Sequence, residues 1–334
     1  MSDLLLAITF AVAAAVSLGA SWLLVTCLER VGARLRLSEA LLGMLAALAA
    51  DAPEITAAVT ALIHGNQRIG AGVVIGSNVF NLAALIGLSG LVAGRVALHR
   101  RVIELAGGVA LWIAAVTLLV VTGGCSPAVG LVLVGGTLGA YVVILGVHHE
   151  RLARLRLPAR WTRWLIAAIT EEELELEVAI HPQRGRTRDV VMSMGAVAVV
   201  VGASVAMEQS AANLGARHGV SEIVVGGLVL AGVTSLPNAV AGVYLATRGR
   251  AAATLSTSFN SNAINVFAGL LIPTTLLGIG APSAQTTFIT ASYLAMTVLV
   301  IVSSYAHRGL RRSSGVAIVV AYLVFAGVLV ASVQ

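Results

Sequence analysis

The hydrophobic pattern of the chain is a series of long uncharged stretches separated by short charged segments. A helix needs about 20 residues to cross ~30 Å of hydrocarbon, and stretches of this length recur along the whole sequence. The pattern therefore predicts ten transmembrane helices. They are expected at 4–27, 40–63, 69–94, two within 105–147, 190–207, 223–247, two within 251–306, and 315–332.

Two long stretches are divided by turn-forming residues. The sequence "TGGCSP" (122–127) splits the first, and "GIGAPSA" (278–284) splits the second. The first span could instead be read as a cleaved signal peptide. Asp3 stands directly before the apolar run and no basic residue precedes it, so we interpret 4–27 as a membrane span.

The composition agrees with an all-α integral membrane protein. Hydrophobic residues make up 58% of the 334 residues and charged residues 11%, with a mean hydropathy of +0.96. The 35 glycines and the low aromatic content of 4% favour close helix packing over a β-barrel. Cys27 and Cys125 have no metal-type spacing, and we interpret both as packing residues.

The basic residues, all of them arginines, indicate the orientation. If both termini lie outside the cell membrane, 19 of the 21 arginines fall in cytoplasmic segments. Only Arg68 and Arg217 then lie outside. We therefore expect a multi-pass monomer whose partners are the lipid bilayer and inorganic cations, with no nucleic acid.

An internal repeat relates the two halves of the chain. "VGARLRLSE" (31–39) resembles "LGARHGVSE" (214–222), and 184 residues then separate Pro53 from Pro237 and Asn78 from Asn262. Each half holds five expected spans, and an odd number inverts the second copy relative to the first. Inverted repeats with interrupted helices are typical of secondary transporters.

This repeat defines the expected organisation. A first five-helix repeat covers 1–147, a cytoplasmic loop covers 148–189, and the second, inverted five-helix repeat covers 190–334. Within the loop, "RWTRWLIAAIT" is suited to a helix lying in the headgroup plane. The acidic run at 171–177 lacks the turn and glycine of an EF-hand, so we expect a solvated charged face there.

The second and seventh spans are expected to be discontinuous helices. In "LAADAPEIT", Pro53 removes a backbone donor and frees the carbonyl of Ala49, next to Asp51 and Glu54. Carboxylates at this depth cost about 2.5–3.5 kcal/mol each on insertion scales, so two in one turn indicate cation or proton binding. Asp51 and Glu54 are also close enough to share one ion.

The second half repeats this design with neutral oxygens. Thr234 and Ser235 precede Pro237 in "GVTSLPNAV", and Asn238 follows it. The third and eighth spans add oxygen ligands at i and i+4, on one helix face each. These are Ser77 with Asn81 and Ser261 with Asn265.

These motifs resemble a known family. "ADAPEI" with "GNQRIGAGVVIGSNVFN", and "GVTSLPN" with "STSFNSNAIN", look like the two alpha repeats of the sodium/calcium exchanger family of cation:calcium antiporters. The resemblance implies ten helices in inverted halves that alternate access between the membrane faces. It also implies that Glu54 is a chief calcium ligand and that hydroxyls before the proline help to bind sodium.

The chain departs from the family pattern at several positions. Asn238 stands where the second glutamate belongs, Asn265 stands where several members have aspartate, and Ala50 and Asp51 replace a Thr-Ser or Asn-Ser pair. A site charge of −2 still balances one divalent ion, two sodium ions or two protons. We therefore expect exchange of Ca2+ against Na+, with a proton-coupled or altered-selectivity exchanger as the alternative.

Two other classes of function remain open at this stage. A carrier of another small substrate would need an aromatic-lined cavity, whereas the polar residues at mid-span here are small oxygen donors. A non-transporting scaffold would explain the loss of acidic residues in the second repeat, although Asp51 restores the number of carboxylates. No nucleophile and base occur together within the spans, so we expect neither an enzyme nor a cofactor.

Overall fold

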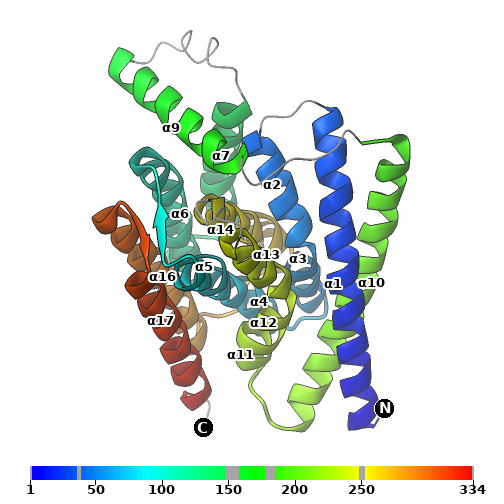
Figure 1. The fold of residues 1–334 in the computed structure, drawn as a ribbon. Helices are drawn as coiled ribbons and strands as arrows, with labels where there is room; N and C mark the ends of the chain where they lie inside the picture. The colour runs from blue at the N-terminus through cyan, green and yellow to red at the C-terminus, as the bar shows by residue number, and fades with distance from the viewer. Residues whose placement is uncertain (1, 36–38, 147–157, 178–184, 248–252, 333–334) are drawn as a thin grey trace.

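The computed structural model describes residues 2–35, 39–146, 158–177, 185–247 and 253–332. In this part of the chain the structure is almost entirely helical (Figure 1). The one departure from an all-α fold is a pair of three-residue strands, β1 (Arg95–Ala97) and β2 (Gly309–Arg311), which run antiparallel. Each strand lies in a short connection between two hydrophobic helices: β1 precedes the helix that begins at Arg100, and β2 precedes the helix that begins at Arg312.

Seven helical segments of the described chain are long and apolar enough to cross a membrane, and two bent helix pairs raise the number to nine. The seven are α1 (Asp3–Arg34), the continuous segment Gln67–Ala93, α6 (Arg100–Val121), α7 (Pro127–Gly146), α10 (Thr187–Arg217), α16 (Ala284–His307) and α17 (Arg312–Ala331). The expected dividing turns are confirmed, because α6 ends before "TGGCSP" and α16 begins at the end of "GIGAPSA".

The one expected span outside these nine, the first of the two within 251–306, is a continuous helical segment of lower hydropathy in the described chain. It consists of α14 (Ala253–Ile264), the π-helical η3 (Asn265–Leu271) and α15 (Ile272–Leu277). Its serine and asparagine residues keep it out of the set that qualifies by composition. A count of ten spans therefore stays a prediction.

Both expected helix breaks are present. The first lies between α2 (Glu39–Ala50) and α3 (Ala52–Ile63), which are bent by 52°. Pro53 frees the Ala49 carbonyl, but that oxygen is not left for a cation: Ser21 of α1 donates to it at 3.1 Å. A hydroxyl from a neighbouring helix thus stabilises the break.

The second break divides the seventh span in the same way. It follows α11 (Glu222–Val224), the π-helical η2 (Val225–Leu230) and α12 (Ala231–Thr234), and α13 (Leu236–Thr247) continues at an angle of 44°. The bounds of α13 are those of α3 shifted by 184 residues (236 minus 52).

The repeat continues in the segment after each break. There, α4 (Gln67–Asn81), η1 (Leu82–Gly87) and α5 (Leu88–Ala93) match α14, η3 and α15 in order, with α5 and α15 related by the same shift. The sequence repeat is therefore also a structural repeat.

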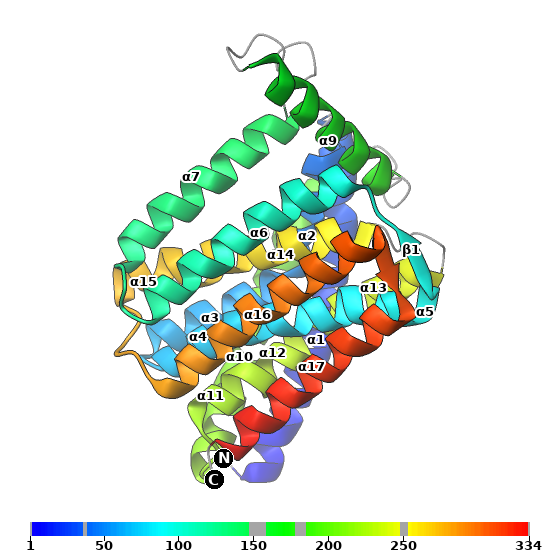
Figure 2. The same cartoon turned by 90° about the vertical axis from the view of Figure 1, so that its left-hand side faces the viewer.

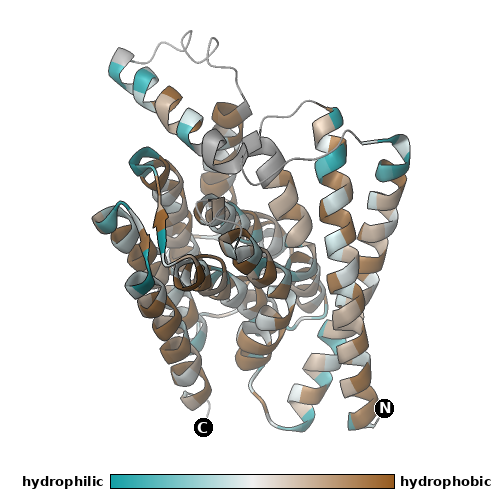
Figure 3. Ribbon diagram, viewed as in Figure 1, coloured by the Kyte–Doolittle hydropathy of each residue, from teal (hydrophilic) through white to brown (hydrophobic). Residues whose placement is uncertain are grey.

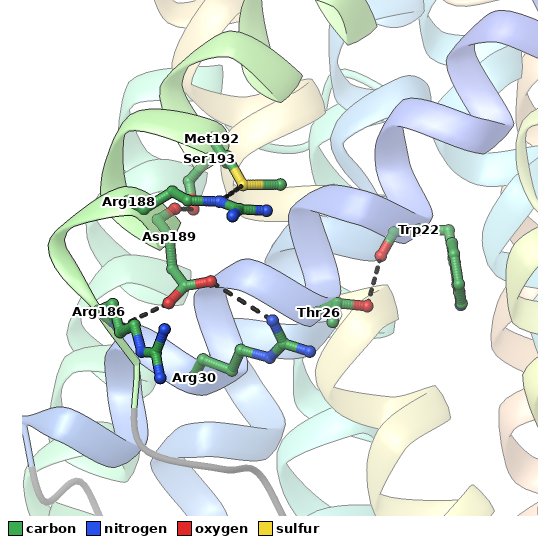
Figure 4. A network of polar contacts seen from close by, with 8 residues as sticks. All are labelled: Trp22, Thr26, Arg30, Arg186, Arg188, Asp189, Met192 and Ser193. Atoms are coloured by element: carbon green, nitrogen blue, oxygen red, sulfur yellow. Dashed lines mark hydrogen bonds and ion pairs between the residues drawn. The ribbon is translucent and has the colours of Figure 1, made fainter.

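The two longest helices, α1 and α10, pack side by side along one flank of the molecule (Figure 1). Ser17 and Ser204 form a hydrogen bond between their middles at 3.1 Å. At the arginine-rich end, Arg30 of α1 donates to Asp189 of α10 at 3.4 Å, and Asp189 also accepts the backbone N–H of Arg186 (Figure 4). These bonds fix the relative position of the two helices at that end.

Hydrophobic residues cover the long helices, and hydrophilic residues gather at helix ends and along α9 (Ala159–Glu177) (Figure 3). The first residues of α1 and the last of α17 lie at the end of the molecule opposite α9 (Figures 1 and 2). Arg101 of α6 pairs with Glu171 of α9 at 2.5 Å, and Ile169 is buried. The expected helix in the loop is present; its position in the headgroup plane stays a prediction.

Backbone contact between the repeats depends on glycine. The α4 sequence "GVVIG" brings Gly72 and Gly76 against Gly226 and Gly227 of η2. A Cβ atom at Gly76 would lie 2.6 Å from the Gly227 Cα, and one at Gly226 would lie 2.9 Å from the Ile69 Cα. The two helices can cross this closely only without side chains at these positions.

The substitution Gly76→Ala is expected to lower the free energy of unfolding by about 1–3 kcal/mol, because the added methyl group would overlap backbone that cannot move aside. The thermal midpoint in detergent measures the effect. Gly202→Ala on α10 is the matched control, since its added Cβ would meet nothing within 4 Å. An equal midpoint for both variants would contradict the close crossing.

Candidate functional site

Four polar segments meet at the two helix breaks. Asp51 and Glu54 come from the first break, and Ser235 and Asn238 come from the second. Asparagines and a serine of α4 and α14 complete the cluster. All of these side chains are buried, with at most 4% of any residue exposed.

Asp51 is held by the second repeat through one of its oxygens. Its Oδ1 accepts a hydrogen bond from Ser261 Oγ at 2.7 Å and another from Asn238 Nδ2 at 3.1 Å. Its Oδ2 is buried and has no hydrogen-bond partner among the described residues. One carboxylate oxygen is therefore occupied and the other is available to a ligand.

Glu54 has the same arrangement. Its Oε1 accepts from Ser235 Oγ at 2.9 Å, and its Oε2 is buried without a partner in the described chain. In the repeat, Glu54 corresponds to Asn238 and Ser235 corresponds to Asp51. The Glu54–Ser235 and Asn238–Asp51 bonds are therefore equivalent contacts, with the charge on the first-repeat side in both cases.

A network of asparagine amides joins α4 to α14. Asn78 Nδ2 donates to the Asn262 backbone carbonyl, and Asn262 Nδ2 donates to the Asn78 carbonyl, both at 3.1 Å. Asn81 donates to Asn262 Oδ1 and Asn265 donates to Asn78 Oδ1, both at 3.3 Å. Such reciprocal contacts are those of a two-fold relation between the repeats.

Asn81 and Asn265 are equivalent in sequence but not in their contacts with the second break. Asn81 Oδ1 accepts from Asn238 Nδ2 at 3.2 Å, and Asn81 Nδ2 donates to Ser261 Oγ at 3.1 Å. Asn265 Oδ1 is buried and has no partner among the described residues. Asn81 thus belongs to the carboxylate cluster, whereas the bonds from Asn265 reach it through Asn78, Asn262 and Asn81 in turn.

Two expected site residues bond to their own helices. Ser77 Oγ donates to the Val74 carbonyl at 2.9 Å, and Thr234 Oγ1 donates to the Leu230 carbonyl at 2.9 Å. Both side chains are buried. Hydroxyls in helices commonly bond to backbone in this way, and their oxygens can still accept or coordinate. Their assignment as ion ligands stays a prediction.

The sequence analysis aligned Asn78 with Asn262 but did not place them at the site. They are the centre of the amide network, and the signal that could have identified them was their place in the repeat. The same network reaches α16, where the buried Tyr293 hydroxyl hydrogen-bonds to the Asn78 side chain.

The carboxylates have no basic counterpart. The ion pairs of the described residues lie elsewhere, at helix ends and loops, and none includes Asp51 or Glu54. In the described part of the chain, no three His, Cys, Asp or Glu side chains lie together in a group that could hold a metal ion. A cation here would meet two carboxylates and neutral oxygens, a ligand set that suits hard cations such as Ca2+.

Replacing Asn78 or Asn262 with alanine is expected to lower the free energy of unfolding by about 1–2 kcal/mol, because each variant loses buried interhelical hydrogen bonds. Thermal midpoints measure this loss. Asn213→Ala is the control, because Asn213 is exposed and bonds only to its own helix at Gln209. A control midpoint as low as the others would contradict a stabilising role for the network.

Comparison with known proteins agrees with this fold. The family described as "Sodium/calcium exchanger protein" matches residues 5–147 and 189–331. Among solved structures, the chain is similar to native YfkE (TM-score 0.67, 17% identity, 99% of this chain and 93% of that one). A comparison with curated proteins gives no match.

Two further structures are similar over almost the whole chain. The H+/Ca2+ exchanger CAX has a TM-score of 0.72 at 13% identity, covering 98% of this chain and 85% of that one. The sodium-calcium exchanger NCX_Mj has a TM-score of 0.59 at 17% identity, covering 97% and 98%. The family match covers both repeats and most of the sequence. The chain belongs to the sodium/calcium exchanger family.

Proposed function

We propose that this protein is a secondary active antiporter that exchanges Ca2+ against Na+ by alternating access. The observation that carries the proposal is the buried pair Asp51 and Glu54. Among the described residues, each has one oxygen without a hydrogen-bond partner, and no basic side chain forms an ion pair with either. Burying charge is costly unless it is paired. A transported cation supplies the missing charge.

Neutral ligands for the cation come from both repeats. Ser235, Asn238 and Ser261 surround the carboxylates from the second repeat, and Asn81 approaches from the first. Ser77, Thr234 and Asn265 are farther members of the proposed ligand set. Because the donors come from two halves that could move relative to each other, closing the site and binding the ion are linked.

The proposed topology has ten spans in two inverted halves. The segment 148–189 joins the halves on the cytoplasmic side of the cell membrane, and both termini lie outside. The reciprocal asparagine contacts support a two-fold relation, and five spans in each half make it an inverted one. The arginine distribution supports the orientation.

Protons are the alternative coupling ion. Sodium favours several neutral oxygens, but Ala50 stands at the position equivalent to Thr234 and offers no hydroxyl. The two unpartnered carboxylate oxygens could instead each accept a proton. The similarity to one H+/Ca2+ exchanger and one sodium-calcium exchanger concerns the fold and favours neither ion.

In proteoliposomes, an outward Na+ gradient is expected to drive Ca2+ uptake, and Glu54→Gln is expected to abolish it because the ion loses a charged ligand. Radioactive Ca2+ accumulation measures the flux. A pH gradient imposed without Na+ tests the proton-coupled alternative. Absence of flux under both gradients would refute the antiporter proposal, and unchanged flux in Glu54→Gln would refute the site.

Exchanging the residues of the Asn238–Asp51 hydrogen bond tests the geometry of the site. Asp51→Asn and Asn238→Asp, made singly, each alter the site charge and are expected to reduce Ca2+ flux by about tenfold or more, from the ~1.5–3 kcal/mol of a hydrogen bond to a charged group. The double variant keeps the charge at −2 and restores a donor–acceptor pair. We expect it to recover much of the lost flux.

The single variants serve as controls for the double variant, and Ca2+-dependent thermal stabilisation checks binding without transport. If the losses of Ca2+ flux in the two single variants add up in the double variant, the negative charge cannot be moved from residue 51 to residue 238 without loss of function. In that case Asp51 would be required at its own position, and the proposed equivalence of the two breaks would be wrong.

A further inference from the structure

A line of polar side chains, three hydroxyls and one amide, extends along α14 and into the first residue of η3. Thr254, Ser258, Ser261 and Asn265 are spaced by four, three and four residues, which places them on one helix face. Ser261 donates to Asp51 at 2.7 Å. The line therefore runs from the charged site to the N-terminal end of α14, which follows Arg248 and Arg250 in the sequence.

Ser258 is one of four buried serines, with Ser256, Ser304 and Ser314, whose hydroxyl has no hydrogen-bond partner among the described residues. Of these four, it is the one that shares the α14 face of Ser261. Several buried hydroxyls in the transmembrane helices donate instead to a carbonyl of their own helix, as those of Thr290 and Thr297 do. Ser258 Oγ is fully buried and has no partner among the described residues. An unmade hydrogen bond in hydrocarbon costs about 1–3 kcal/mol, which packing alone does not explain.

The equivalent face of α4 has no such line. Subtracting 184 places Gly70 at the position of Thr254 and Val74 at that of Ser258. A Cβ atom at Gly70 would lie 2.7 Å from Leu62 Cγ, so α3 closes tightly over this part of α4. The half of the molecule that holds α3 and α4 is therefore sealed and apolar along this face.

The helix α13 does not seal α14 in the same way. It makes few contacts with α14 and packs on η1 and α5 instead, where Gly242 lies against Leu85. Ala241 of α13 is exposed, whereas its equivalent Ala57 is fully buried in α3. At the same end, a cluster of Tyr141, Leu145, Ile169 and Ala253 covers the start of α14.

We propose that Thr254 and Ser258 line the cytoplasmic branch of the ion pathway and pass partly dehydrated cations to and from Asp51. The cluster of Tyr141, Leu145, Ile169 and Ala253 closes the outer end of this branch. Hydroxyl oxygens replace water around a hard cation as it leaves bulk solvent. This proposal rests on the proposed antiport and on its orientation.

Sided labelling tests the pathway directly. In Ser258→Cys, a membrane-impermeant thiol reagent is expected to modify residue 258 from the cytoplasmic face, in excess of the labelling of wild type with Cys27 and Cys125. The same reagent applied from outside is expected to give no excess. Ser256→Cys, on the opposite face of α14, is the matched control and should not be labelled.

Transport by conservative variants provides the second readout. Ser258→Ala is expected to slow Ca2+ flux about tenfold, equal to ~1.4 kcal/mol on the transit barrier, while Ca2+-dependent thermal stabilisation stays that of wild type. Ser258→Thr, which keeps the hydroxyl, should retain flux. If the hydroxyl had no role in transport, Ser258→Ala would keep or raise the thermal midpoint, because it removes an unpartnered buried group, and Ca2+ flux would stay that of wild type.

The outcomes separate this inference from the proposed function. Absence of flux in wild type would overturn both. Normal wild-type flux with normal flux in Ser258→Ala, or with no cytoplasmic labelling of Ser258→Cys, would overturn the pathway and leave the antiport standing. Equal labelling of the Ser258→Cys and Ser256→Cys variants would also overturn it, because it would show general loosening of α14.

Discussion

The structure depends on one electrostatic constraint: two carboxylates lie inside a hydrophobic molecule, and no basic side chain in the described part of the chain is paired to them. Each of Asp51 and Glu54 has one oxygen held by the second repeat and one oxygen that has no partner among the residues the structure describes. Ionised carboxylates in hydrocarbon are tolerated only when something compensates their charge. In a chain of the sodium/calcium exchanger family, the compensating charge is the mobile ion itself.

The rest of the fold keeps these two groups in place. The proline-containing breaks turn the helices at the site, and Ser21 pairs the carbonyl that Pro53 frees, so the bend leaves no cost in backbone hydrogen bonds there. Glycines of α4 and η2 let the repeats approach at backbone distance. The asparagine bonds around Asn78 and Asn262 then fix the register between α4 and α14.

The sequence was sufficient for features with local causes. Charges and turn residues marked the helix ends, and Pro53 and Pro237 marked the breaks within a residue or two. It was not sufficient for features that depend on how bent helices meet. The hydrogen-bond partner of Glu54 depends on the helix bends of 52° and 44°. A hydroxyl such as that of Ser77 can bond either to a distant group or to a carbonyl of its own helix, and the sequence does not distinguish the two.

The asymmetry of charge between the repeats links ion binding to their relative position. A ligand shifts a conformational equilibrium only through a difference in its affinity for the two states. Both carboxylates belong to the first repeat, and the side chains that donate to their paired oxygens are Ser235, Asn238 and Ser261 of the second. A cation bound to Asp51 and Glu54 therefore changes the strength of the hydrogen bonds from Ser235, Asn238 and Ser261, which hold the two halves together at the site. If each repeat supplied one carboxylate, the ion would bind both halves in the same way. Here the ion binds the carboxylates of the first repeat, and it affects the second repeat through the three neutral donors that bond to those carboxylates.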